Sequence, residues 1–344
     1  MDQSPIRIGF LGTGFIATYH SKSLKRGGAN IVRAGVYDPD TQRAEAFAKA
    51  SGHTVCHSED EAIDSADALY VCAWTSEHLP LVRKVVHTGK AVFCEKPLGL
   101  NLINSQELAE VVLASGVINQ VGLVLRHAPS YLWTRELITD PKAGRVMNVV
   151  FRDDQFIPIQ GYYESSWRSD IKRAGSGTLL EHSIHDVDML QFLVGDISEV
   201  SMRSSNFHGY PGIEDSVSAT LCFKNGAVGT LSSIWHDNLT RPSQRRVEIF
   251  CEHRTISIHG HEWFGPVDWH DADGASGSIQ GDEMLDKTKP LAYGSTNPDS
   301  AFVHAVRNNI PAFPTVTTAL QAHVVVDAMY RSAANNGATV TLDV

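Results

Sequence analysis

Long hydrophobic runs are missing from this sequence. A membrane-spanning helix needs roughly 18 or more consecutive apolar residues, and no stretch of the 344-residue chain meets that requirement. The amino terminus also lacks a basic region followed by an apolar one, because residues 1–5 lead directly into the strand-like residues 6–10. We therefore expect no membrane span, no membrane partner and no secretory signal peptide.

Basic residues and cysteines are both scarce. The chain has 29 Lys and Arg against 39 Asp and Glu, which gives a formal net charge of −10. That field repels polyanions, so nucleic acid is not expected as a partner. The five cysteines, at positions 56, 72, 94, 222 and 251, are odd in number and mostly lie in apolar runs. Reduced, buried thiols are the simplest interpretation and are typical of a cytoplasmic protein.

The first part of the chain alternates between apolar runs and amphipathic stretches. Hydrophobic residues make up 42% of the chain and charged residues 20%, as in globular proteins, and the length favours two domains. An alternation of strands and helices predicts a doubly wound, parallel sheet over residues 1–123. The predicted strands are 6–11, 31–37, 68–73, 91–94 and 118–122, and the predicted helices are 14–25, 41–51, 77–88 and 101–115.

The second part, residues 124–344, has consecutive strands and predicts an α+β domain with a mainly antiparallel sheet. Asn225-Gly226 indicates a hairpin. The stretch 270–297 is rich in Gly, Asp and Ser and predicts a long loop, after which two helices and a short strand close the chain. The other predicted elements are helices at 129–139 and 177–194 and strands at 146–152, 197–206, 216–223, 227–235, 246–251 and 255–259.

A glycine-rich turn joins the first strand to the first helix. Gly12, Gly14 and Ala17 fit the dinucleotide fingerprint, with Ala in the third place. Its glycines permit a tight turn and let the backbone approach a pyrophosphate at the helix N-terminus. Glycines also occur in ordinary strand-to-helix turns, but the flanking strand and helix favour a nucleotide site.

Asp38 follows the strand 31–37, where a carboxylate can accept hydrogen bonds from the adenosine ribose and repel a 2′-phosphate. This favours NAD(H), although the nearby Arg43 leaves NADP(H) open. Asp38 or Asp40 could also be a helix N-cap, and the two roles are compatible.

Lys96 stands in Cys94-Glu95-Lys96-Pro97 at the end of strand 91–94. Ligands of doubly wound sheets bind beyond the carboxyl ends of the strands, where Lys96 is expected. In isolation, the motif would be a surface lysine before a turn proline.

Glu181, His185 and Asp188 form a stripe beside the apolar stripe of the predicted helix 177–194. His185 is then flanked one turn away on each side by a carboxylate, which can fix the imidazole tautomer and raise its proton affinity. The alternative is a partly buried histidine that bridges two acids without a catalytic role.

Together these motifs resemble the Gfo/Idh/MocA family of oxidoreductases. The resemblance covers nearly the whole chain and lies in the order and spacing of the motifs. The family's Asp-x-Gly-x-His-x-x-Asp signature stands here with Glu at 181 and Ser at 183. The further matching positions are the Gly12/Gly14/Ala17 turn, His78, Glu95-Lys96-Pro97, residues 122–126, Pro129, Trp167-Arg168 and residues 327–332.

The resemblance implies a dehydrogenase or reductase that uses NAD(P) and acts on a CH–OH group of a sugar, an inositol or a related polyol. It implies that Lys96 binds the reacting oxygen, His185 takes the hydroxyl proton and Glu181 orients His185. The implied cofactor contacts are Gly12, Gly14, Phe15, Ile16, Asp38, Thr75, His78, Glu95 and Lys96. The expected substrate contacts are Arg126, Trp167, Arg168, His185 and Trp235.

Purely structural roles stay open for several of these residues. His78 could simply lie on a helix face, Arg126 and Arg168 could pair with acids, and Trp235 could pack in the core. His20 is expected to be structural or a minor cofactor contact.

Other functions also stay open. The same fold could serve a nucleotide-sensing regulator, or a lyase or glycosidase that oxidises a sugar transiently and regenerates NAD. A metal bound by Glu181, His182, His185 and Asp186 has little support from the resemblance. We expect a small-molecule carbohydrate partner and a homo-oligomer.

Overall fold

The computed structural model describes residues 4–261 and 263–342. The chain folds into two compact units. The first comprises Met1–Val124 with Tyr293–Leu320, and the second comprises Leu125–Ala292 with Gln321–Val344. The chain thus leaves the first unit after residue 124 and returns to it for residues 293–320.

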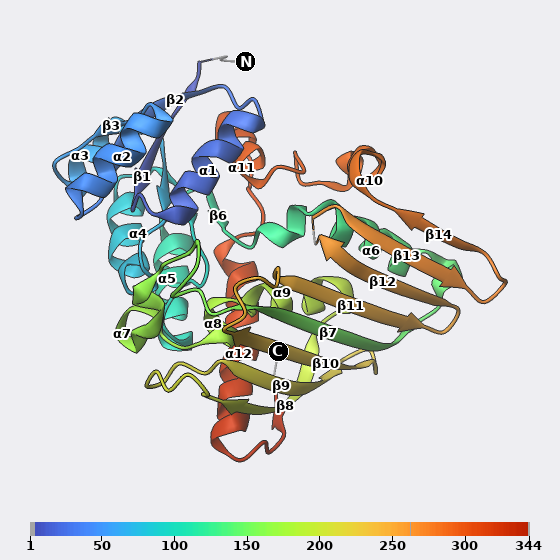
Figure 1. Cartoon of the computed structure of the whole chain (residues 1–344). Helices are drawn as coiled ribbons and strands as arrows, with labels where there is room; N and C mark the ends of the chain where they lie inside the picture. The colour runs from blue at the N-terminus through green and yellow to red at the C-terminus, as the bar shows by residue number, and fades with distance from the viewer. Residues whose placement is uncertain (1–3, 262, 343–344) are drawn as a thin grey trace. The chain divides into compact units, whose positions relative to one another are not determined.

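A six-stranded parallel sheet with the order β3-β2-β1-β4-β5-β6 forms the centre of the first unit (Figure 1). The order reverses between β1 and β4, which is the arrangement of a doubly wound sheet, so this part of the predicted fold class is confirmed. Sequence patterns missed β3 because it has only two residues. The strands are β1 (Ile6–Leu11), β2 (Ile31–Tyr37), β3 (Thr54–Val55), β4 (Ala68–Val71), β5 (Ala91–Cys94) and β6 (Asn119–Val121).

Helices cover this sheet through two buried apolar clusters. One of the clusters includes Phe302 and Val303 of α11, a helix of the returning segment. Figure 1 shows α11 beside α1, as their contacts require. The helices of this unit are α1 (Phe15–Arg26), α2 (Thr41–Ser51), α3 (Glu59–Ser65), α4 (His78–His87), α5 (Leu102–Ser115) and α11 (Pro298–Asn308).

The second unit is built on a nine-stranded sheet with the order β14-β13-β12-β11-β7-β10-β9-β8-β15. Its neighbours pair antiparallel except β7 and β10, which are parallel. The mainly antiparallel sheet confirms the second part of the predicted fold class, and the predicted hairpin at Asn225-Gly226 joins β9 to β10. The strands are β7 (Val146–Phe156), β8 (Ile197–Ser205), β9 (Ser216–Phe223), β10 (Val228–His236), β11 (Gln244–Cys251), β12 (Arg254–His261), β13 (Gly265–Asp271), β14 (Ser276–Ile279) and β15 (Val340–Thr341).

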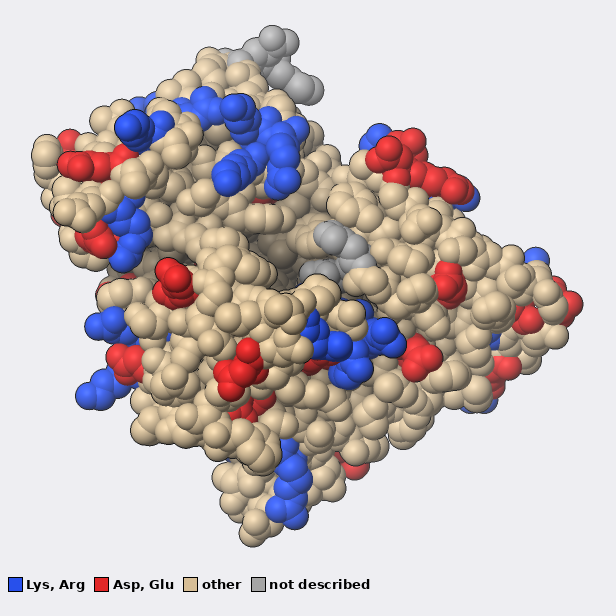
Figure 2. All heavy atoms as spheres, in the orientation of Figure 1, with Lys and Arg blue, Asp and Glu red and all other residues tan. Residues whose placement is uncertain are grey.

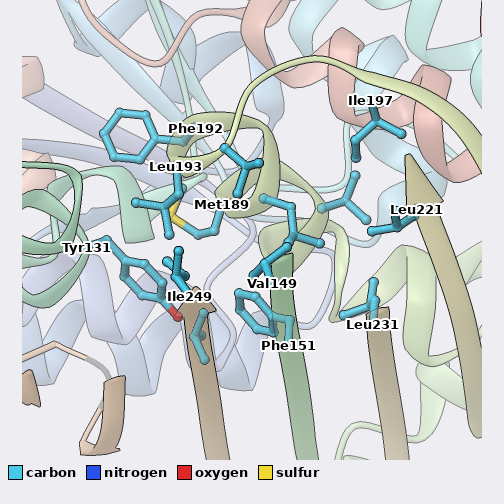
Figure 3. Close-up of a cluster of buried hydrophobic side chains, with 14 of the residues drawn as sticks. Tyr131, Val149, Phe151, Met189, Phe192, Leu193, Ile197, Leu221, Leu231 and Ile249 are labelled. Carbon is cyan, nitrogen blue, oxygen red and sulfur yellow. The ribbon is translucent and has the colours of Figure 1, made fainter. Parts of the chain in front are cut away.

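One face of this sheet carries the main core of the unit. Side chains from α6 (Pro129–Thr139) and α9 (Ile184–Leu193) meet strand residues there, and α12 (Val316–Ala334) adds its apolar residues from Ala322 onward. Figure 3 shows Tyr131, Met189 and Leu193 over Val149 and Phe151 of β7. The opposite face exposes apolar side chains of β7, β10 and β11, namely Met147, Val150, Val228 and Phe250.

The predicted helix 177–194 is wrong in one respect, because it is broken at His182–Ser183. It forms α8 (Thr178–Glu181) and then α9. The carbonyl of Thr178 accepts hydrogen bonds from the N–H groups of both His182 and Ser183, which ends α8. The Ser183 hydroxyl then donates to Ser233 of β10 at 2.6 Å. Buried polar bonding therefore overrides the helical pattern.

The predicted loop at 270–297 is also wrong, because this stretch forms part of β13, all of β14 and α10 (Gly281–Thr288). Glycines are typical of loops, which is why the sequence predicts one here. Gly277 instead lies under the ring of Trp269 on the neighbouring strand, where any Cβ would overlap the indole. A glycine in a strand can thus mark close packing rather than a turn.

Charged side chains of both signs lie in separate groups on the visible face, and a basic group covers part of the first unit (Figure 2). The last turn of α1 carries the exposed Lys25 and Arg26, which lie at the negative end of the helix dipole.

Within residues 4–261 and 263–342, no helix combines the length and apolar character that crossing a membrane requires. All five cysteines are free thiols.

Adjacent valines of β7 test which face of the large sheet is buried. Val149 is fully buried, whereas Val150 is 38% exposed on the opposite face. We expect Val149→Ala to lower the free energy of unfolding by about 2 kcal/mol or more. The matched control Val150→Ala should cost about 1 kcal/mol or less. Urea denaturation measures both, and equal losses would contradict the assignment of the faces.

Candidate functional site

The glycine turn after β1 has a conformation that requires Gly12. Its φ is +89°, and a Cβ there would lie 2.7 Å from backbone atoms of Cys72 and Ala73 beyond β4. Gly14 is the N-cap of α1 and provides no side-chain cap. A Cβ on Gly14 would have no atom within 4 Å, so the first turn of α1, with Phe15 and Ile16, adjoins open space. The N–H groups in the first turn of a helix point along its axis and suit a phosphate.

Asp38 fixes this turn to the end of β2. Its buried carboxylate accepts hydrogen bonds through Oδ2 from the Thr13 N–H (2.9 Å) and the Thr13 hydroxyl (3.1 Å). Oδ1 accepts from the Asp40 N–H at 2.9 Å and, more distantly, from Arg43 at 3.3 Å. Asp40 is the N-cap of α2, so the capping role belongs to Asp40. The weakest of these partners, Arg43, is the one that a ribose hydroxyl could replace.

Thr75 and His78 lie beyond β4, in a short 3-10 turn (Thr75–Glu77) and at the start of α4. Both are buried. Nδ1 of His78 is 2.8 Å from the carbonyl oxygen of Pro97, and Nε2 is 3.2 Å from that of Ala73. Burial lowers the pKa of His78, so the ring is neutral and donates from one nitrogen only. The shorter distance favours donation from Nδ1 to Pro97, which connects α4 to the segment after β5.

Glu95 and Lys96 follow β5 at the carboxyl edge of the sheet. Glu95 is buried, and its Oε2 accepts a hydrogen bond from the Lys96 N–H at 3.1 Å. Gly122, after β6, makes room for that carboxylate, because a Cβ there would overlap it. The Lys96 side chain is half-buried. These residues and the glycine turn all follow strands at one edge of the sheet, which fits a dinucleotide site.

In the second unit, the two carboxylates that the sequence pattern predicts one turn from His185 are each bound by an arginine, and the break at His182–Ser183 places Glu181 on a different helix from His185. Glu181 of α8 accepts from Nε of Arg168 at 2.6 Å. Asp188 of α9 accepts from Nε and Nη2 of Arg126 at 2.8–3.1 Å, and both side chains are buried. Burial raises the pKa of Asp188, and Arg126 opposes that effect. His185 itself is buried in the first turn of α9.

The two predicted substrate tryptophans have different surroundings. Trp235 is 3% exposed and packs with Ile157, Ala174 and Ile213, which favours core packing. Trp167 is only partly buried against the same cluster. The guanidinium of Arg168 lies 4.7 Å from the centre of the Trp167 ring, so Trp167 and Arg168 form one unit with Glu181.

A buried polar network, which sequence reasoning missed, surrounds two of the residues considered as metal ligands. Arg245 of β11 contacts Asp153 at 2.9 Å and Asp186 at 2.8 Å, and it lies 3.2 Å from His182. Burial and the charge of Asp153 raise the pKa of Asp186 to about 7. A guanidinium bound to these atoms competes directly with a cation, so the arrangement disfavours the metal hypothesis. The β7 and β11 residues gave no sequence signal because their partners are 29 or more positions away.

Comparisons with known families match both units. A family described as "Oxidoreductase family, NAD-binding Rossmann fold" matches residues 6–123, and one described as "GFO/IDH/MocA C-terminal domain" matches residues 131–257. An inositol 2-dehydrogenase of Rhizobium meliloti is 28% identical over 339 residues, which are 96% of this chain and 97% of that protein. A scyllo-inositol 2-dehydrogenase (NAD(+)) of Bacillus subtilis is 32% identical over 240 residues, 66% of this chain and 67% of its own.

Solved structures share the fold. Levoglucosan dehydrogenase in complex with NADH and levoglucosan has a TM-score of 0.87 at 19% identity, over 99% of this chain and 100% of that one. The WlbA dehydrogenase of Bordetella pertussis, in complex with NADH and UDP-GlcNAcA, has a TM-score of 0.81 at 20% identity, over 99% of each chain.

Substitutions at the two glycines should separate folding from dinucleotide binding. Gly12→Ala should lower the free energy of unfolding by roughly 2–4 kcal/mol, because both its φ and the nearby backbone oppose a Cβ. Gly14→Ala should leave the melting temperature unchanged, because its Cβ meets open space. It should weaken NAD(H) binding about tenfold or more, because a pyrophosphate could no longer approach the backbone. Thermal melts and calorimetric titration measure both, and unaltered affinity in Gly14→Ala would place the dinucleotide elsewhere.

Proposed function

The chain belongs to the GFO/IDH/MocA family of NAD(P)-dependent oxidoreductases, and on that premise we propose that it transfers hydride between NAD(H) and a sugar, an inositol or a related polyol. The observation that carries the proposal is Lys96, half-buried directly after β5 at the carboxyl edge of the sheet. The similarity to an inositol 2-dehydrogenase over 96% of the chain supports this substrate class.

The first unit would hold the cofactor. We assign the pyrophosphate to the turn at Gly12–Ile16 and the adenosine ribose to Asp38, with Thr75, His78, Glu95 and Lys96 at the nicotinamide end. The open space at Gly14 and the Asp38 carboxylate beside the turn support this assignment. When bound, the nicotinamide supplies a hydride acceptor or donor.

Lys96 and His185 are assigned to the chemistry. The Lys96 ammonium would bind the substrate oxygen and stabilise the negative charge that develops there during oxidation. His185 would accept the proton of the hydroxyl group. The ion pair between Glu181 and Arg168 supports a place for Glu181 on the substrate side, together with Trp167. The family resemblance alone suggests that Glu181 also orients His185. Arg126 would brace α9 through Asp188.

A panel of sugars and inositols tests the reaction directly. We expect net NADH formation from NAD⁺ with at least one of them. Conversion of substrate without accumulation of NADH would instead indicate a redox-cycling lyase or glycosidase. The proposed dehydrogenase would be wrong if no sugar or polyol supported either process.

NAD(H) should bind at least about tenfold more tightly than NADP(H), because Asp38 opposes a 2′-phosphate. Arg43→Ala is the control, because Arg43 contacts Asp38 at only 3.3 Å. It should leave NAD(H) affinity nearly unchanged and reduce any residual binding of NADP(H). Isothermal titration measures the four affinities, and tighter binding of NADP(H) would overturn the role of Asp38.

Removal of each reacting group should have its own kinetic signature. Lys96→Ala should reduce kcat by about 10²-fold or more, as the loss of an electrostatic stabiliser does, with a much smaller effect on NAD(H) affinity.

In the wild type, kcat/KM for oxidation should fall at acid pH, because a protonated imidazole cannot accept a proton. His185→Asn should lower the rate and abolish this acid limb. Folded variants with near wild-type turnover would remove Lys96 or His185 from the mechanism.

A further inference from the structure

A buried chain of charged groups in the first unit joins α11 to the segment that carries Lys96. His20 of α1 is 0% exposed and lies between two carboxylates. Its Nδ1 is 2.6 Å from Oδ1 of Asp299, in the first turn of α11, and its Nε2 is 2.8 Å from Oε1 of Glu95. Asp299 and Glu95 are also buried. The proposed reaction makes no use of His20 or Asp299.

When both carboxylates are ionised, the two contacts require His20 to carry a proton on each ring nitrogen. An ionised carboxylate only accepts hydrogen bonds, and a neutral imidazole can donate only one. A neutral ring would therefore turn a lone pair toward one of the two oxygens. Burial lowers the pKa of His20, but the charges and hydrogen bonds of Asp299 and Glu95 outweigh it and raise that pKa to about 10.

The described aromatic side chains that contact the His20 ring supply no competing cation. The rings of Tyr70 (β4) and Phe93 (β5) pack against the imidazole, and Tyr19 of α1 contacts its edge. Burial raises the pKa values of Tyr70 and of the thiols Cys72 and Cys94, so these groups stay neutral near pH 7. His20 is thus the positive charge between two buried negative charges.

The chain of contacts continues from Glu95 to the main chain of Lys96. Oε1 of Glu95 is bound by His20, which leaves Oε2 to accept the hydrogen bond of the Lys96 N–H at 3.1 Å. Gly122 leaves the space that the carboxylate fills. The orientation of the carboxylate, and with it the position of the Lys96 backbone, depends on the cation behind it.

The far end of the chain is fixed by the returning segment. Asn297, the N-cap of α11, donates to the Ser23 carbonyl at 3.1 Å and hydroxyl at 3.0 Å, which joins α11 to α1. Gln120 donates to the Pro298 carbonyl at 3.0 Å. These contacts join the start of α11 to α1 and β6, and none of them involves His20, Glu95 or the Asp299 carboxylate.

We propose that His20 is a positioning residue: as an imidazolium held by Asp299, it fixes the Glu95 carboxylate and, through it, the backbone of Lys96. The segment 293–320 thereby contributes to the placement of the lysine through Asp299. The kinetic part of this inference rests on the proposed function of Lys96, whereas the charge state and the backbone contact do not.

Nuclear magnetic resonance of ¹⁵N-histidine-labelled full-length protein tests the charge state without substrate. We expect two ring N–H signals for His20 that persist from pH 6.5 to 9, assigned by their loss in His20→Gln. A His20 ring with one proton at pH 8 would overturn the proposal.

The backbone contact has its own readout in the amide resonance of Lys96. Asp299→Asn keeps the size of the side chain and removes the charge that holds His20, so it should shift this resonance. Asn297→Ala is the matched control, because it weakens the docking of α11 and leaves the ion chain intact. An equal shift in both variants would reduce His20 and Asp299 to ordinary packing residues and overturn the proposal.

Kinetics then distinguish positioning from stability. Asp299→Asn should lower kcat about tenfold and change the NAD(H) dissociation constant less than threefold, as expected for a misplaced catalytic group. Asn297→Ala should lower the melting temperature without lowering kcat of the folded enzyme. Unchanged kcat in Asp299→Asn would overturn the inference. Absence of turnover in the wild type would instead count against the proposed function, while the resonance experiments would still decide the role of His20.

The pH dependence of stability gives a further check with a defined sign. The pKa of His20 in the folded protein, about 10, lies above the ordinary value of 6.5. Its stabilisation is therefore complete below pH 6.5 and is lost as pH rises through about 10. The unfolding constant of the wild type relative to that of His20→Gln should rise up to about tenfold per pH unit in this window. A ratio independent of pH would contradict a charged His20.

Discussion

A carboxylate that is buried away from water loses solvation free energy of the order of several kcal/mol. Cations or N–H donors must replace the lost water contacts. Both units of this protein meet that requirement at the residues on which function is proposed to depend. Asp38 receives its donors from the glycine turn, Glu95 from His20 and Lys96, and Asp188 from Arg126. In each case the compensating group comes from another element, so neutralising the charge also fixes the position of one element against another.

The fold could be predicted where local pattern and final structure agree. The predicted bounds of β2, β5, α2 and α6 match the structure, because each apolar run lies on the sheet or faces it. The failures have physical causes of longer range. The predicted helix 177–194 breaks at His182–Ser183, where the Ser183 hydroxyl bonds to β10, and Gly277 lies in a strand where Trp269 covers it. Ser233 lies 50 positions from Ser183, beyond any local window. Trp269 is close to Gly277 in sequence, but only the pairing of β13 with β14 brings the ring over the glycine.

The candidate site shows the same division. The glycine turn, Asp38 and Lys96 follow strands at known positions, so motif spacing was enough to bring them to one edge of the sheet. The partners of the charged residues were not predictable. Glu181 is bound by Arg168, 13 positions away, and His20 by Asp299, 279 positions away. Spacing along a helix suggests neighbours, but it does not say which of several acids and bases will meet after folding.

The return of residues 293–320 to the first unit has a consequence for synthesis on the ribosome. When residue 124 has been made, the sheet of the first unit still lacks Phe302 over Tyr70 and Phe93, and His20 still lacks one of its two counter-charges. The nascent chain must therefore emerge almost to its last helix before this unit can close. The second unit has most of its strands available earlier, which reverses the usual amino-terminal-first order of domain completion.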